Sequence, residues 1–225
     1  MKFKGFILGL LLCCVTCVAF ANVPLMPVKD LRPGMQGIGK TVIKGDTIEE
    51  FNVEVIGVTG SESAGHSILV RLYGDLIEKT GGVAQGMSGS PVYIDGRLVG
   101  AVAFGKTFND PHYCFLTPIH NMLKLLDTPV SRSGDWLPKS TGLLAGGFTP
   151  MGMEYLQERL QGLGLEATVG GGTGAENVGK LEAGSAVGAS IMQGDLTLGA
   201  LGTVTWVDDK GNVLAFGHPF MQRGE

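Results

Sequence analysis

The stretch Gly86-Met87-Ser88-Gly89-Ser90-Pro91 places a serine between two glycines, just before a proline. This pattern can present a hydroxyl nucleophile on a sharply bent loop. A glycine before the serine lets the backbone bend so that the N–H groups of Gly86 and Ser88 point at one spot, where the oxyanion of a tetrahedral intermediate would form. The sequence therefore predicts Ser88 as a nucleophile, with Gly86 and Ser88 as the donors of an oxyanion hole.

A nucleophilic serine needs a general base, and His218 has the most constrained setting of the four histidines. It follows directly on a predicted strand and lies between Gly217 and Pro219. A base must be held in one orientation within hydrogen-bond reach of the nucleophile. We therefore predict His218 as the base; the alternative is a structural histidine that caps a strand end. The others are expected to be solvated or packed: His66, His112 and His120.

Short apolar runs separated by turn residues surround both motifs. Apolar residues 92–94, the turn pair Asp95-Gly96 and apolar residues 98–103 predict a hairpin directly after the serine. The 37 glycines and the 7% aromatic content favour a turn-rich β architecture over a helical bundle. We expect a mainly β fold, a barrel or a sandwich, with further strands at 41–43, 51–58, 67–72, 186–192, 199–207 and 212–216.

Changes in composition divide the chain into parts. Residues 22–127 are expected to form a β-barrel domain that carries the serine motif, residues 128–140 a linker rich in Pro, Ser and Gly, and residues 141–225 a second β-rich segment that carries the histidine motif. Two helices are predicted, one over 116–126 with Thr117 as N-cap and Pro118 in the first turn, and one over 153–163.

The first 21 residues have the features of a signal peptide. Lys2 and Lys4 precede an apolar stretch, and Ala19-Phe20-Ala21 provides a cleavage signal. The apolar stretch, about 15 residues, is shorter than the roughly 20 that a spanning helix needs. We expect export to the periplasm, the cell envelope or the medium; the alternative is an uncleaved membrane anchor.

Export would leave a single cysteine in the chain. Cys13, Cys14 and Cys17 lie in the predicted signal peptide, and Cys114 is the remaining one. An exported chain with one cysteine has no internal disulfide. We expect Cys114 to be a buried small hydrophobic residue rather than a catalytic thiol.

Composition also excludes several classes of function. The net charge is −4 and no basic cluster appears, which argues against nucleic acid as a partner. No pair of histidines or carboxylates shows metal-ligand spacing, so no metal site is expected. Nothing in the sequence indicates a small-molecule cofactor.

At this point the residues show a family resemblance. The segment Thr80–Pro91, with Gly96–Val102 after it, resembles the nucleophile region of the SpoIVB-type serine peptidases. Residues 202–218 resemble the segment in which that family carries its catalytic histidine. The resemblance covers residues 26–127 and 186–220, and it implies a chymotrypsin-like β-barrel fold and the activity of an exported serine endopeptidase. The PDZ domain of the family's sporulation member has no recognisable counterpart in this sequence.

The resemblance leaves the orienting acid and the order of the motifs open. The family's acid lies some residues before its serine, which makes Asp75 the nearest candidate, and an ordinary turn role is the alternative. The histidine segment precedes the serine in the sporulation peptidase but follows it here. A permuted or truncated barrel, pairing between chains, or a further C-terminal region beyond Glu225 are the expectations that fit this order. Asp195, Asp208 and Asp209 are alternative acids, with hairpin-turn roles as the other interpretation, and Asp110 is a candidate cap of the loop before Pro111.

Two functions therefore compete. The first is an exported serine endopeptidase in which Ser88 attacks a protein or peptide substrate and His218 takes its proton. The second is a non-catalytic exported module that binds a peptide or a protein by strand addition, or an inactive fragment of a longer peptidase.

Overall fold

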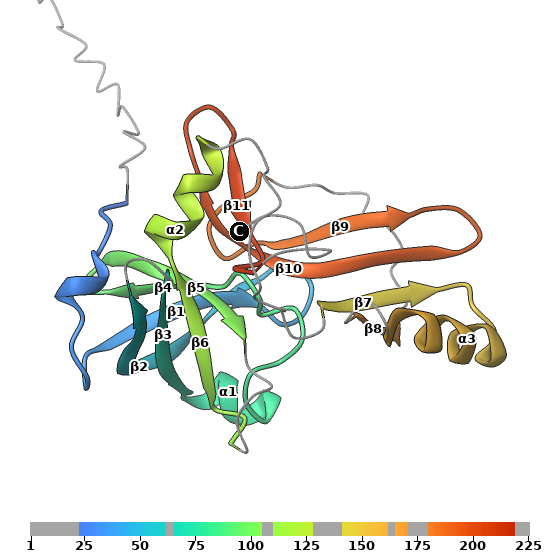
Figure 1. Ribbon diagram of the computed structural model, residues 1–225, viewed down its shortest axis with the longest axis horizontal. Coiled ribbons are helices and arrows are strands. Elements are labelled where there is room, and N and C mark those ends of the chain that lie inside the picture. Colours follow the sequence, from blue (N-terminus) through green and yellow to red (C-terminus); the bar gives the residue numbers. More distant parts are fainter. Residues whose placement is uncertain are drawn as a thin grey trace, which may run out of the picture.

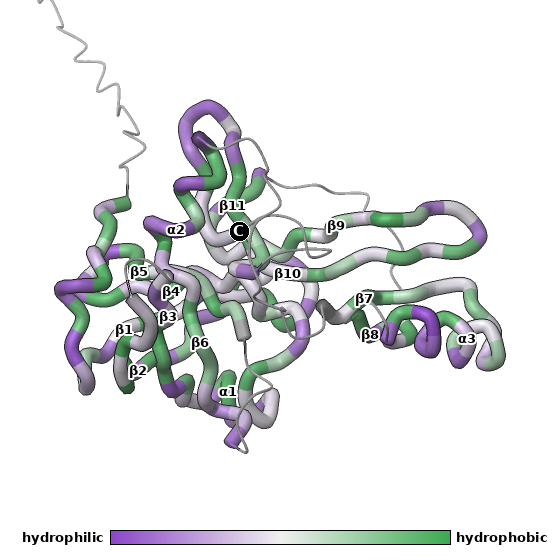
Figure 2. The backbone as a smooth tube through the Cα atoms, in the orientation of Figure 1, coloured by the Kyte–Doolittle hydropathy of each residue, from purple (hydrophilic) through white to green (hydrophobic). Residues whose placement is uncertain are grey.

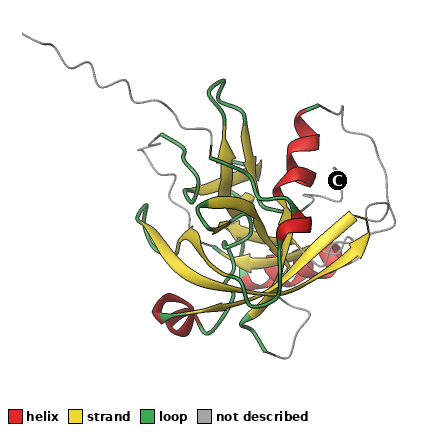
Figure 3. Ribbon diagram, turned by 90° about the vertical axis from the view of Figure 1, so that its left-hand side faces the viewer, coloured by secondary structure: helices red, strands yellow, loops and turns green. Residues whose placement is uncertain are grey.

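The computed structural model describes residues 23–61, 65–104, 110–127, 141–161, 165–170 and 180–218. The expected signal peptide (1–21) and linker (128–140) lie outside these residues. The described residues form a barrel and a second sheet that extends away from it (Figure 1). Strands account for most of the regular structure, as Figure 3 shows. The predicted mainly β fold is confirmed.

Six antiparallel strands close the barrel in the order β1-β2-β3-β6-β5-β4, with β1 paired to β4. This closed barrel is consistent with the chymotrypsin-like fold that the resemblance implies. Alternate residues of its strands point inward, so that Val53 and Val55 of β2 and Val70 and Leu72 of β3 are buried. The strands are β1 (Gln36–Val42), β2 (Ile48–Ser61), β3 (Gly65–Tyr73), β4 (Pro91–Ile94), β5 (Arg97–Phe104) and β6 (Tyr113–Pro118).

Short helical segments accompany the barrel. A 3₁₀ turn, η1 (Val28–Asp30), precedes β1, and α1 (Asp75–Thr80) follows β3 and packs against β2 and β3. The helix α2 (Ile119–Leu123) follows β6 and continues into a 3₁₀ turn, η2 (Lys124–Leu126). No helix among the described residues has both the length and the apolar character to cross a membrane.

The second sheet has five strands, in the order β11-β10-β7-β8 with β9 paired to β10. The strands β7 and β8 are parallel, and α3 (Pro150–Gln161) connects them and packs against β8. The core between α3 and the sheet contains Leu143, Ala145, Met153, Leu160, Leu165, Ala167 and Ala200. The strands are β7 (Thr141–Gly146), β8 (Leu165–Val169), β9 (Ala186–Met192), β10 (Thr197–Val207) and β11 (Val213–Ala215).

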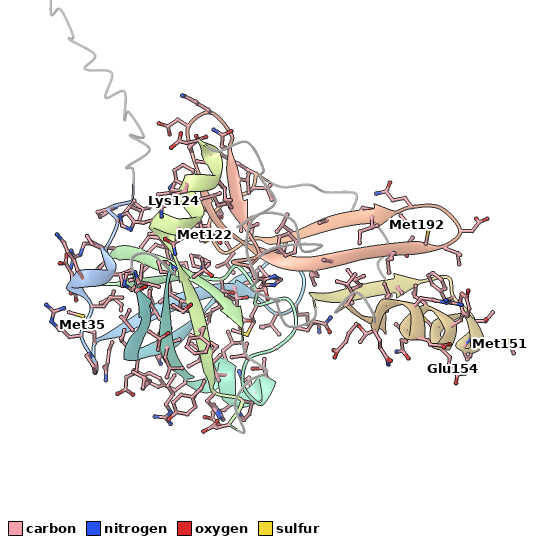
Figure 4. All side chains as sticks on the ribbon, in the orientation of Figure 1. Met35, Met122, Lys124, Met151, Glu154 and Met192 are labelled. Carbon is pink, nitrogen blue, oxygen red and sulfur yellow. The ribbon has the colours of Figure 1, made fainter. Side chains whose placement is uncertain are left out.

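The outer end of the second sheet is its less covered part. Met151 on α3 is 80% exposed, and Met192 at the end of β9 is also exposed, and both lie far from the barrel in Figure 4. Figure 2 shows α3 as a mixture of hydrophilic and hydrophobic residues and the β10–β11 turn as hydrophilic.

A separate cluster of buried side chains joins the barrel to the second sheet. Leu214 of β11 packs with Leu98 and Ala101 of β5 and with Ile119 and Met122 of α2. The end of the second sheet that leads to His218 is therefore fixed on the barrel by apolar packing.

The structure confirms some of the predicted elements and corrects others. The hairpin after Ser88 is present, and its turn residues Asp95 and Gly96 have φ of 50° and 70°, as a type I′ turn requires. The helix predicted over 116–126 is wrong in its first turn: Leu116–Pro118 belong to β6, and the helix begins at Ile119 with Pro118 as its N-cap. Pairing of β6 with β3 and β5, with alternate residues buried, outweighs the local capping signal.

Cys114 of β6 is fully buried, as the sequence predicts, and this burial raises the pKa of its thiol well above the usual range. The thiolate is the reactive form, so the native protein should not react with Ellman's reagent. For the chain from Asn22 we expect no reactive thiol in buffer and one in denaturant. Rapid reaction of the native protein would contradict this burial.

Candidate active site

The serine loop connects α1 to β4. Gly86 and Gly89 have φ of +97° and +94°, values that glycine adopts at little cost, so the two glycines allow the bends on either side of Ser88. Met87 is fully buried, and the Ala84 N–H donates to its Sδ at 3.3 Å. This anchor in the barrel core leaves Ser88 half-buried.

The N–H groups of the loop divide into two sets. Those of Met87, Gly89 and Ser90 donate to the carbonyl oxygens of Ala84, Val102 and Met87, at 3.2, 2.7 and 2.9 Å. Within the described part of the chain, the N–H groups of Gly86 and Ser88 have no acceptor. Both residues are half-buried, and these two N–H groups are the donors that the sequence predicts for an oxyanion hole.

The strand β10 of the second sheet runs against the serine loop. The Thr203 N–H donates to the Ser88 carbonyl at 2.7 Å, and the Thr203 hydroxyl donates to the Gly86 carbonyl at 2.9 Å. The Thr205 hydroxyl donates to the Gly89 carbonyl at 2.7 Å. A Cβ at Gly89 would collide with the Thr203 carbonyl and the Phe216 N, so this close approach requires glycine.

The segment that carries His218 meets the serine loop at Val102. The Val102 carbonyl accepts the Gly89 N–H, and a Cβ at Gly217 would press against the same carbonyl. The Thr117 hydroxyl donates to the Gly217 carbonyl at 2.5 Å. Residues next to Ser88 and next to His218, far apart in the chain, therefore lie beside each other.

The two side chains themselves are not hydrogen-bonded. Among the described residues, none accepts from or donates to the Ser88 Oγ. The ring of His218 lies edge-to-face with that of Phe216, with centroids 6.5 Å apart. Catalytic hydrogen bonds are often long in the free enzyme and shorten when substrate binds.

Asp75 lies apart from this contact. It is the first residue of α1, and its side chain is exposed. In Figure 1, α1 and β11 lie at well-separated ends of the barrel region. The structure does not bring Asp75 to the histidine segment.

Asp208, another candidate acid, and Asp110, the expected loop cap, both have local structural roles. Asp208 accepts the N–H groups of Lys210 and Asn212, at 2.9 and 2.7 Å, in the β10–β11 turn. Desolvation opposes ionisation of Asp208, but these bonds and that from the Asn212 side chain outweigh it and lower the pKa. Asp110 accepts the backbone N–H of His112 at 2.9 Å and contacts its ring Nδ1 at 2.7 Å; these bonds lower the pKa of Asp110. Asp195 and Asp209 are exposed.

A hollow of about 460 Å³ lies elsewhere on the barrel, between β1 and the β4–β5 turn. Lys40, Tyr93 and Asp95 are among its lining residues, and burial raises the pKa of Tyr93 to about 12. Its lining includes neither Ser88 nor His218. No group of three or more His, Cys, Asp or Glu side chains among the described residues is placed to hold a metal ion.

Sequence reasoning missed the two threonines of β10. Thr203 and Thr205 are separated by one residue of a strand, so their side chains lie on the same face. Two hydroxyls on one face of the apolar segment 202–207 were the available signal, because buried hydroxyls need partners.

A comparison with protein families agrees with the resemblance. Residues 18–123 match the family model described as SpoIVB peptidase S55. The match contains the closed barrel and the Ser88 loop and ends before His218. Neither a curated protein nor a solved structure matches the chain. This match supports the assignment of the barrel segment to the SpoIVB-type serine peptidase family.

Proposed function

We propose that this chain is a serine endopeptidase in which Ser88 is the nucleophile and His218 the general base. One observation carries the proposal: in the described part of the chain, the N–H groups of Gly86 and Ser88, on either side of one peptide unit of the serine loop, have no acceptor. Such a pair of donors can stabilise an oxyanion. The contact between the histidine segment and the serine loop at Val102 supports His218 as the base.

The proposed reaction is acyl transfer to the serine. The Ser88 Oγ attacks the carbonyl carbon of a peptide bond while His218 takes its proton, and the oxyanion accepts hydrogen bonds from the N–H groups of Gly86 and Ser88. His218 returns the proton to the leaving amine, which leaves an acyl group on Ser88. Water, deprotonated by His218, then releases the acyl group. The substrate class is protein or peptide, as the family indicates.

The first prediction concerns Ser88. We expect Ser88→Ala to abolish labelling by a fluorophosphonate probe and to lower peptidase activity by about a thousandfold or more. Because the Ser88 Oγ has no hydrogen-bond partner among the described residues, the free energy of unfolding should change by less than about 0.5 kcal/mol. Gel fluorescence of the labelled protein and chemical denaturation measure these two effects.

A matched control is Ser90→Ala, which removes a fully buried hydroxyl of the same loop. Ser90 is not a nucleophile in the proposal, so Ser90→Ala should still be labelled. A folded wild-type chain that the probe does not label would argue for the alternative, a module that binds peptides without cleaving them.

The second prediction concerns the base and its orienting acid. His218→Ala should lower the labelling rate by at least about a hundredfold, since a base contributes about 10²–10⁴ to the rate. Asp75 stays a prediction, which its exposed side chain does not favour. Asp75→Asn decides it: a labelling rate within about twofold of wild type would exclude Asp75, and a loss comparable to that of His218→Ala would support it.

The third prediction concerns export. We propose that residues 1–21 direct export and are removed, on the features of their sequence. Amino-terminal sequencing of the protein recovered from the cell envelope or medium should begin at Asn22. A start at Met1 would support an uncleaved anchor instead.

A further inference from the structure

We propose that Thr203, assisted by Thr205, is a positioning residue of this site: it fixes the peptide units on both sides of the unit between Met87 and Ser88, and so keeps the Ser88 N–H turned toward the substrate. This inference rests on the proposed function. It assigns to the second sheet, outside the segment that matches the family model, a part in building the oxyanion hole of the barrel.

Thr203 donates two hydrogen bonds to the serine loop. Its hydroxyl holds the Gly86 carbonyl, which belongs to the peptide unit between Gly86 and Met87. Its N–H holds the Ser88 carbonyl, which belongs to the unit between Ser88 and Gly89. The Ser88 N–H belongs to the unit between these two. Both neighbours of that unit are therefore held by one residue.

Two further hydrogen bonds hold the unit in the middle and the unit that follows Ser88–Gly89. The carbonyl of the middle unit, that of Met87, accepts the Ser90 N–H at 2.9 Å. In a trans peptide the C=O and the N–H point in opposite directions, so this bond turns the Ser88 N–H the other way. The Thr205 hydroxyl holds the next carbonyl, that of Gly89, at 2.7 Å. These bonds fix the direction of the Ser88 N–H without using it.

The glycines of the serine loop make these hydrogen bonds necessary. Gly86 and Gly89 adopt positive φ freely, and the same freedom makes rotation of the adjoining peptide units inexpensive. A rotated unit would turn an N–H away from the oxyanion. The hydrogen bonds that Thr203 donates to the carbonyls of Gly86 and Ser88 oppose this rotation.

The Thr203 hydroxyl lies in a buried environment. Thr203 is 1% exposed, so its own hydroxyl is shielded from water. The hydroxyls of Ser90 and Thr41 lie 3.4 and 3.5 Å from that of Thr203, beyond the usual range of a strong O–H···O bond. The single proton of Thr203 is therefore committed to the Gly86 carbonyl, at 2.9 Å.

The test compares Thr203→Val, which keeps the shape and removes the hydroxyl, with Thr203→Ser, which keeps the hydroxyl. The readout is inactivation by a fluorophosphonate, in which Ser88 displaces fluoride from phosphorus and a phosphoryl oxygen occupies the oxyanion hole. We expect the maximal inactivation rate of Thr203→Val to fall about tenfold or more, with the half-saturating probe concentration nearly unchanged. Thr203→Ser should lie within about threefold of wild type.

Thr41→Val is the matched control, because Thr41 is equally buried and donates to no carbonyl of the serine loop. The fluorophosphonate should inactivate Thr41→Val at the wild-type rate. All rates are measured below the lowest unfolding temperature of the set. Should Thr203→Val not fold, Thr205→Val, which removes the bond to the Gly89 carbonyl, carries the same expectation.

The outcomes separate this inference from the proposed function. If the wild type is not labelled, the proposed function fails. If the wild type is labelled and Thr203→Val, or Thr205→Val in its place, is inactivated at the wild-type rate, the positioning role alone fails. Loss in Thr203→Val without rescue by Thr203→Ser would also overturn it, because the hydroxyl would then not be the cause.

Discussion

The structure of the site depends on the close approach of β10 to the serine loop. The Thr203 carbonyl and the Phe216 N lie where a Cβ of Gly89 would be, so the two segments meet backbone to backbone. At this distance Thr203 and Thr205 bind the carbonyls of Gly86, Ser88 and Gly89. A side chain at Gly89 would separate the segments and break these bonds together.

The serine loop is consequently held from two sides. On the barrel side, Met87 is fixed in the core and the Gly89 N–H binds Val102 of β5. On the other side, β10 holds the carbonyls, and Leu214 of β11 packs with Leu98, Ala101 and the helix α2. The same docking carries the chain from β11 to Gly217, against the Val102 carbonyl. In the sequence, the histidine segment follows the serine. In the structure, the second sheet returns to the barrel at the serine loop and brings the histidine segment there.

The sequence predicted the features that local pattern determines. Short apolar runs between turn residues identified most of the barrel strands and also β9, β10 and β11, and Asp95-Gly96 identified the turn of the β4–β5 hairpin. Prediction failed where distant contacts decide. Thr117-Pro118 reads as the start of a helix, yet Leu116–Pro118 pair with neighbouring strands. The partners of Gly86 and Gly89 are threonines 117 and 116 residues away, a relation that no local pattern contains.

A crystal structure of the protein with Ser88 phosphonylated by a fluorophosphonate would test the oxyanion hole most directly. We expect a phosphoryl oxygen about 3 Å from the N atoms of both Gly86 and Ser88, with Thr203 still bound to the Gly86 carbonyl. A phosphoryl oxygen directed into solvent, or either N–H turned to an acceptor within the protein, would contradict this expectation.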